Sequence, residues 1–177
     1  MYKIIDKTIL NKDVDLMIID APLVAKNALP GHFVIIRVNE DGERIPLTIV
    51  EIVGTHVTII YQKLGYSTNL LSTKNVGDYI SDIVGPLGKP AHIRDVKRVI
   101  GIAGGVGAAP LYPQLKAYHE KGVNVDLVLG GRTKNHLLLL DKYKEICDNI
   151  YLATDDGSVG KKGFVTDVLK ELYKKRK

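Results

Sequence analysis

The stretch Gly104-Gly-Val-Gly-Ala-Ala-Pro110 decides how this sequence is interpreted. An apolar run at residues 99–103 precedes it, and an amphipathic pattern that ends near Lys121 follows it. A strand that passes through glycines into a helix presents unpaired backbone N–H groups and the positive end of the helix dipole, both of which bind phosphate. Pro110 stands where the dinucleotide motif G-x-G-x-x-G has its third glycine, so the stretch alone leaves a purely structural turn open.

The second half of the chain, residues 97–177, alternates apolar strands with amphipathic helices. We expect strands at 98–103, 124–129 and 149–154, and helices at 108–121, 137–147 and 163–173. This alternation indicates parallel strands joined by right-handed crossovers. It predicts a partial doubly wound, Rossmann-like parallel sheet of three strands in the order 3-2-1, with the first strand at one edge.

The first half, residues 1–92, has the pattern of an antiparallel β-barrel. Short runs rich in β-branched and aromatic residues recur at 16–19, 33–38, 47–50, 57–61 and 79–84, with turn residues between them. A short helix is expected at 67–71, and Gly85-Pro-Leu-Gly88 is expected to close the barrel as a turn. The boundary between the halves falls at about residues 90–97.

Composition is that of an ordinary globular protein, with 45% hydrophobic and 25% charged residues. The net charge of +5 is too small to indicate nucleic-acid binding, and we place the basic residues 174–177 at a solvated helix end. No run approaches the ~20 apolar residues that span a membrane, and no signal-peptide pattern begins the chain. We expect a cytoplasmic protein without nucleic-acid or membrane partners.

The sequence gives little support for a metal site or for a hydrolase. The single cysteine, Cys147, cannot form an internal disulfide or hold an iron–sulfur cluster or structural zinc, and we expect it to be a small buried residue on a helix. The five histidines show no metal-ligand spacing, and no serine lies in a G-x-S-x-G motif.

Three loops follow the carboxyl ends of the three expected parallel strands, where ligands bind in open α/β sheets. The first is the glycine turn, the second contains Arg132, and the third is Thr154-Asp-Asp-Gly-Ser158. Arg132 offers a fixed positive charge, and Asp155 and Asp156 can accept hydrogen bonds from ribose hydroxyls. Tight turns and surface solvation are the alternative explanations.

The barrel half has candidates of its own. Residues 44–48, Arg-Ile-Pro-Leu-Thr, enter a strand, and residues 61–68 leave the next strand and begin the short helix. Gly65, Ser67 and Thr68 can bind a second phosphate group at that helix start. The alternative is that Ser67 or Thr68 simply caps the helix.

Together these motifs resemble the ferredoxin–NADP reductase superfamily. The resemblance covers nearly the whole chain and is strongest to the electron-transfer subunits of dihydroorotate dehydrogenase and the small subunits of sulfide dehydrogenase and NADH-dependent ferredoxin–NADP oxidoreductase. Its most specific parts are the glycine turn, residues 154–158 and residues 85–88.

The resemblance implies a flavoprotein oxidoreductase. Residues 1–92 would bind FAD, residues 97–177 would bind NAD(P)H, and a hydride would pass from the nicotinamide to the flavin, with electrons going onward to a partner. It assigns no catalytic residue and no metal. The implied cofactor-binding residues are Arg44, Pro46, Leu47, Thr48, Tyr61, Gly65, Ser67 and Thr68 for the flavin, and Gly104, Gly105, Val106, Gly107, Pro110, Arg132, Asp155 and Asp156 for the nicotinamide nucleotide.

Two departures from the superfamily pattern qualify this interpretation. The pattern Arg-x-Tyr-Ser/Thr has Ile45 and Leu47 at its first and third places, and Arg44 is displaced by one. Relatives also continue with further strands and a four-cysteine [2Fe–2S] segment, so the sequence looks truncated at its C-terminus and without a cluster. The alternative function is therefore a truncated, non-catalytic flavin-binding or subunit-docking module.

The first parallel strand would then have an open, apolar edge. We expect another copy of the chain, a larger redox subunit or the barrel to cover it.

Overall fold

The computed structural model describes residues 1–174, and the chain divides into two compact units, Met1–His92 and the part from Ile93 onward. The first unit is an antiparallel sheet of seven strands in the order β6-β1-β2-β5-β4-β3-β7. These are β1 (Tyr2–Asn11), β2 (Val14–Asp20), β3 (Phe33–Arg37), β4 (Arg44–Val53), β5 (His56–Gln62), β6 (Tyr79–Ile80) and β7 (Asp82–Leu87). Two helices, α1 (Pro22–Ala25) and α2 (Tyr66–Thr73), interrupt them.

The sheet curls into a nearly closed barrel because one short stretch of chain occupies both of its edges. β6 pairs with β1, and β7 pairs with β3, although only Ser81 separates β6 from β7. The Ser81 N–H donates to the Val38 carbonyl at 3.3 Å where the chain passes from one edge to the other. The expected antiparallel barrel is confirmed.

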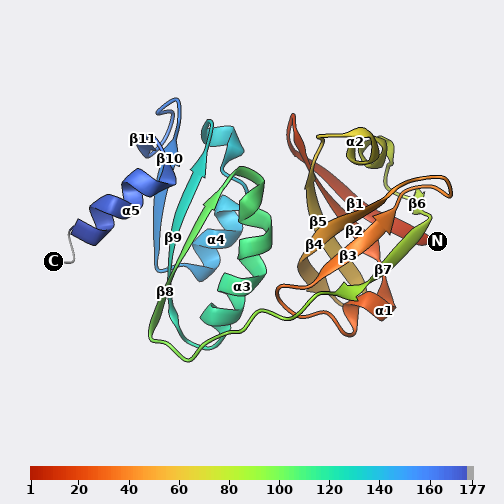
Figure 1. Ribbon diagram of the computed structural model, residues 1–177, viewed down its shortest axis with the longest axis horizontal. Helices are drawn as coiled ribbons and strands as arrows, with labels where there is room; N and C mark the ends of the chain where they lie inside the picture. The colour runs from red at the N-terminus through yellow and green to blue at the C-terminus, as the bar shows by residue number, and fades with distance from the viewer. Residues whose placement is uncertain (175–177) are drawn as a thin grey trace. The chain divides into compact units, whose positions relative to one another are not determined.

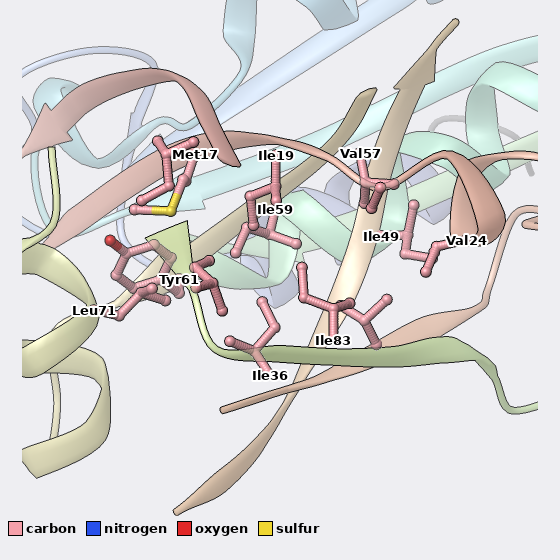
Figure 2. Close-up of a cluster of buried hydrophobic side chains, with 14 of the residues drawn as sticks. Met17, Ile19, Val24, Ile36, Ile49, Val57, Ile59, Tyr61, Leu71 and Ile83 are labelled. Atoms are coloured by element: carbon pink, nitrogen blue, oxygen red, sulfur yellow. The ribbon is translucent and has the colours of Figure 1, made fainter. Parts of the chain in front are cut away.

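Alternating side chains fill the barrel. In β3, Val34 and Ile36 are buried while their neighbours are only half-buried, which is the period of a strand with one face on a core. Figure 2 shows these inward side chains from the strands, among them Ile59 and Ile36, meeting Val24 of α1 and Leu71 of α2.

The second unit is a parallel sheet of four strands in the order β11-β10-β9-β8. The strands are β8 (Arg98–Gly104), β9 (Asn124–Gly131), β10 (Asn149–Thr154) and β11 (Lys161–Lys162). Figure 1 shows α3 (Ala108–Glu120) and α4 (Leu140–Ile146) on one face and α5 (Val165–Lys174) on the other. Two 3-10 turns, η1 (Gly105–Gly107) and η2 (Lys134–His136), precede α3 and α4. The order 3-2-1 is confirmed, and a fourth strand of two residues, too short to leave a pattern, extends it.

A polar clamp joins the amino ends of the three long parallel strands. The Asp126 side chain of β9 is 1% exposed and accepts hydrogen bonds from Nε and Nη2 of Arg98 in β8, at 2.9 and 3.2 Å. It also accepts one from Nδ2 of Asn149 in β10, at 2.9 Å. At the other end of the strands, Gly104 lies opposite Gly130 and Thr154 opposite Gly131, so the carboxyl ends finish level.

Several expectations need correction. β1 was not anticipated, because Lys3, Asp6 and Lys7 interrupt its apolar residues. The run 79–84 is two strands rather than one. Residues 85–87 continue β7 along β3 instead of forming a turn, with a shift of register beside Phe33.

The helix expected at 137–147 begins only at Leu140, because Leu139 has a left-handed backbone (φ 59°). Cys147 therefore follows α4 in an extended conformation and is half-buried. Burial raises the pKa of its thiol to about 12. Residues 175–177 of the basic tail lie outside the described residues.

No helix within residues 1–174 has the length and apolar character needed to cross a membrane. In the same range, no group of three or more His, Cys, Asp or Glu side chains is arranged to hold a metal ion.

Replacing Ile59 by Ala tests the barrel core. Ile59 is 0% exposed, so Ile59→Ala removes buried methyl groups and leaves a cavity, and we expect a loss of about 2–5 kcal/mol in the free energy of unfolding. Urea unfolding followed by circular dichroism measures it. Ile9→Ala, at a side chain that is 68% exposed, is the matched control, and an equal loss in both variants would contradict this account of the core.

Candidate functional site

The three loops that follow β8, β9 and β10 lie side by side at the carboxyl ends of these parallel strands. The N–H groups of Asp155 and Asp156 donate to the carbonyls of Gly131 and Arg132, at 3.2 and 3.3 Å. The Lys134 N–H donates to Ser158 Oγ at 2.9 Å. The second and third loops are thus bonded to each other through two backbone bonds and the Ser158 hydroxyl.

The glycine turn has free space beside its backbone at two positions. A Cβ placed on Gly104 or Gly107 would meet no atom within 4 Å, and their φ angles of −134° and −60° suit any residue. The fold itself therefore does not require glycine at either position. Glycine at a position where the fold would accept a larger residue leaves room for a ligand to approach the main chain.

Other glycines at this sheet have structural reasons. A Cβ on Gly131 would lie 2.9 Å from the backbone of His136, and one on Gly130 would lie 2.5 Å from Val165 Cγ1. Gly105 has a φ of +53°, which favours glycine whatever the space. Only part of the glycine pattern is thus explained by the fold.

The glycine turn leads directly into α3, as the sequence predicts. Ala108 and Ala109 are buried, and Pro110 lies in the first turn, where a missing N–H costs no helical bond. The Ala108 N–H at the helix start donates back to the carbonyls of Gly105 and Val106, so the turn of residues 104–107 is bonded directly to the first residue of the helix. No side chain caps this helix start.

Charged side chains flank the turn on the neighbouring loops. Arg132, Asp155 and Asp156 are all exposed. Asp156 Oδ1 accepts a hydrogen bond from the Ser158 N–H at 2.9 Å, and this bond, with a second from the Ser158 hydroxyl, holds the pKa of Asp156 below its usual value. Asp156 is therefore ionised at neutral pH and keeps a full negative charge at this edge.

The start of α2 in the barrel has the same character. Gly65 precedes the helix with an extended φ of −165°, and a Cβ there would also meet no atom within 4 Å. Thr68 Oγ1 accepts hydrogen bonds from the N–H groups of Leu64 and Gly65, at 3.0 and 3.2 Å. The hydroxyl stabilises the approach to the helix but takes none of the N–H groups of its first turn.

Ser67 is buried and is engaged by an acid. Its Oγ donates to Glu43 Oε2 at 2.9 Å, so a carboxylate lies at the N-terminus of α2. Of the two alternative caps, Ser67 is the second residue of α2 and does not cap it, whereas Thr68, at the third position, accepts from the N–H of the N-cap residue Gly65.

The candidates on β4 lie on both faces of the strand. Leu47 packs against the barrel core, whereas Pro46 and Thr48 alternate with it and face the other way. Arg44 Nη1 donates to Asp82 Oδ2 at 2.8 Å, and this bond lowers the pKa of Asp82. A ligand on the outer face would meet the side chains of Pro46 and Thr48, but Leu47 only through its backbone.

Tyr61 lies inside the barrel rather than on its surface. Its side chain is 1% exposed and packs near Met17 and Leu71 (Figure 2). Burial, together with the nearby Asp15 carboxylate, raises the pKa of the Tyr61 hydroxyl. Asp15 in turn forms a 3.0 Å ion pair with Lys63. Tyr61 can thus support the segment that leads to Gly65, but its ring is covered.

Sequence reasoning missed three side chains at these sites. Glu43 contacts Ser67, Ser158 orders Asp156, and Tyr66 at the start of α2 is 75% exposed. Only Tyr66 carried a usable signal, as an aromatic residue next to a candidate phosphate-binding glycine. Glu43 stands in an ordinary charged turn, where nothing marks its partner.

No protein-family model matches the chain. Among curated proteins, it is 45% identical to a dihydroorotate dehydrogenase B electron transfer subunit homolog of Thermotoga maritima, aligned over 100% of the chain and 63% of that protein. It is 33% identical to the dihydroorotate dehydrogenase B electron transfer subunit of Shouchella clausii, over 95% of the chain and 67% of that protein. The chain thus spans roughly two thirds of the length of these relatives.

Solved structures agree. The chain matches a structure of NADH-dependent reduced ferredoxin–NADP oxidoreductase with a TM-score of 0.92 and 43% identity, over 98% of the chain and 63% of that protein. The ferredoxin–NADP⁺ reductase of Plasmodium falciparum shares the fold, with a TM-score of 0.77 at 18% identity, over 98% of the chain and 78% of that protein. With a barrel followed by a parallel sheet and this level of identity, the chain belongs to the ferredoxin–NADP reductase superfamily, in the family of the dihydroorotate dehydrogenase B electron transfer subunits.

Proposed function

We propose that this chain is the flavin- and nicotinamide-nucleotide-binding part of an electron-transfer subunit, which takes a hydride from NAD(P)H to FAD and passes electrons to a partner. One observation carries the proposal. In each unit, a helix begins beside glycines at positions where the fold has space for a larger side chain. Diphosphates bind at such places. The names of the relatives support the same function.

In the barrel, the N–H groups at the start of α2 would bind the FAD diphosphate, with Gly65 allowing its close approach. Pro46 and Thr48 would lie along the flavin on the outer face of β4. Arg44, held by Asp82, would contribute positive charge beside them. These residues bind and orient the cofactor.

In the second unit, Gly104, Gly105 and Gly107 and the first turn of α3 would bind the diphosphate of the nicotinamide nucleotide. Arg132, Asp155 and Asp156 would contact its adenosine half. A bound flavin supplies the redox chemistry, because it accepts two electrons as a hydride and can release them singly. The protein residues would hold and orient the two nucleotides.

The partner would be a larger redox subunit or a second copy of the chain. Among the strands of residues 1–174, β8 pairs with β9 alone, and its Ile102 is 41% exposed. An apolar edge strand is open to pairing with another chain, which supports this part of the proposal.

The test of the function is reconstitution with FAD followed by addition of NADH without oxygen. We expect the protein to retain FAD through gel filtration and NADH or NADPH to bleach its visible absorbance. Failure to retain FAD would overturn the proposal. Retained FAD that neither coenzyme reduces would favour the non-catalytic flavin-binding module instead.

Two glycine variants separate binding from folding. Gly65→Ala and Gly104→Ala introduce a Cβ where the fold leaves space, so we expect melting temperatures close to that of the wild type. Gly65→Ala should weaken FAD binding and spare NADH binding, and Gly104→Ala should do the reverse. Fluorescence titrations measure both affinities, and equal effects of the two variants on both ligands would contradict the assignment of two sites.

Glu43→Gln tests whether the carboxylate at Ser67 opposes the flavin diphosphate. Two like charges in contact in water repel by at most about 1 kcal/mol, so removing one should tighten FAD binding by up to about fivefold. Flavin fluorescence titration measures the change. Glu40→Gln, an exposed acid in the same loop, is the matched control, and unchanged or weaker binding in Glu43→Gln would show that the carboxylate does not oppose the diphosphate.

Asp156→Asn tests the preference between coenzymes. The ionised Asp156 should repel the 2′-phosphate of NADPH, whereas Arg132 and Lys134 on the adjacent loop attract it. We therefore expect the variant to improve kcat/KM for NADPH relative to NADH several-fold. Glu120→Gln makes the same charge change at the far end of α3, and an equal shift there would mean that net charge alone sets the preference.

A further inference from the structure

Tyr143 of α4 forms a buried hydrogen bond to the residue that follows the glycine turn. Its side chain is fully buried, and its hydroxyl donates to the Ala108 carbonyl at 2.7 Å. Ala108 is the first residue of α3 and comes directly after Gly107. The bond thus joins two segments that lie 35 residues apart in the sequence at the candidate nucleotide site.

The α-helix does not need this bond. The Ala108 carbonyl is the acceptor for the N–H four residues later, and a carbonyl oxygen has a second lone pair that can accept from Tyr143. Burial raises the pKa of the Tyr143 hydroxyl, which therefore stays protonated and remains a donor. Because a buried phenol needs a partner, the bond fixes where α4 lies against the first turn of α3.

The rings around Tyr143 strengthen this attachment. Tyr112, one turn further along α3, meets Tyr143 edge to face, with ring centroids 5.4 Å apart and planes at 84°. Lys142 Nζ lies 5.7 Å from the centre of the Tyr112 ring. Because α4 follows the loop that contains Arg132, Tyr143 sets the position of the glycine turn relative to that loop.

We propose that Tyr143 is a positioning residue for the nicotinamide nucleotide. Its hydroxyl holds the Ala108 carbonyl, at the residue whose N–H donates back to the Gly105 and Val106 carbonyls, and so keeps the backbone of the turn at 105–107 in one arrangement for a diphosphate. A preorganised site binds more tightly because less order must be imposed on binding. The inference rests on the proposed function, since it concerns the same nucleotide.

Tyr143→Phe removes the hydroxyl and keeps the ring in the core. We expect the dissociation constant and KM for NADH to rise about five- to tenfold, with kcat at saturating NADH and the affinity for FAD unchanged. Without any ligand, hydrogen exchange of the amides at 105–109 should become faster. This second readout reports on the turn itself and needs no activity.

Tyr118→Phe is the matched control. Tyr118 lies near the other end of α3, and its hydroxyl accepts a hydrogen bond from the Arg94 N–H at 3.2 Å. The same atom is thus removed from a tyrosine of α3 itself, away from the glycine turn. We expect Tyr118→Phe to leave both NADH affinity and exchange at 105–109 as in the wild type.

The outcomes separate the inference from the function on which it rests. If the wild type binds NADH and Tyr143→Phe binds it equally well, or if both Phe variants weaken it equally, Tyr143 has only a structural role and the inference is wrong. If the wild type retains FAD but binds neither coenzyme, the proposed function fails and the inference fails with it, whatever the exchange rates show.

Discussion

The register of the parallel strands is the constraint on which the candidate nucleotide site depends. Asp126 binds Arg98 and Asn149 across three neighbouring strands at their amino ends. A buried carboxylate is costly unless it is fully paired, so this arrangement strongly disfavours a slip of one strand against the next. The same register places Gly104 opposite Gly130 and Thr154 opposite Gly131 at the other ends of the strands. Polar contacts at the amino ends of the strands thus align the loops at their carboxyl ends.

In the barrel, strand pairing at both sheet edges and apolar packing hold the candidate site in place. Its two sheet edges are occupied by β6 and β7, which leaves no long unpaired edge in that unit. Inside, the core extends from the strands to α2 through Leu71, so the helix whose N-terminus faces a proposed ligand is anchored by apolar packing. In both units, the candidate binding backbone is short and partly exposed, and it is attached to a buried core.

The sequence predicted the parts of this structure that have a strong local pattern. The strands of the second unit and α3 follow from apolar runs and the glycine turn, and their order follows from the handedness of crossovers. β1 was not predicted, because charged residues interrupt the alternation of its apolar side chains. β11 was not predicted, because a strand of two residues is too short to show any alternation. For the sites, residue types located the loops, but partners came only from the fold: nothing in the sequence joins Ser67 to Glu43, or Tyr143 to Ala108. Tyr61 was selected for its neighbours and is packed inward.

The chain's single cysteine has a practical consequence. Cys147 is half-buried, and at a pKa of about 12 only roughly one thiol in 10⁵ is ionised at pH 7. Since the thiolate is the species that reacts with maleimides, the native protein should take up such dyes slowly. Exposed cysteines introduced one on each unit would then be labelled in preference, without first removing the natural one. Energy transfer between the two dyes would then report the distance between the labelled positions.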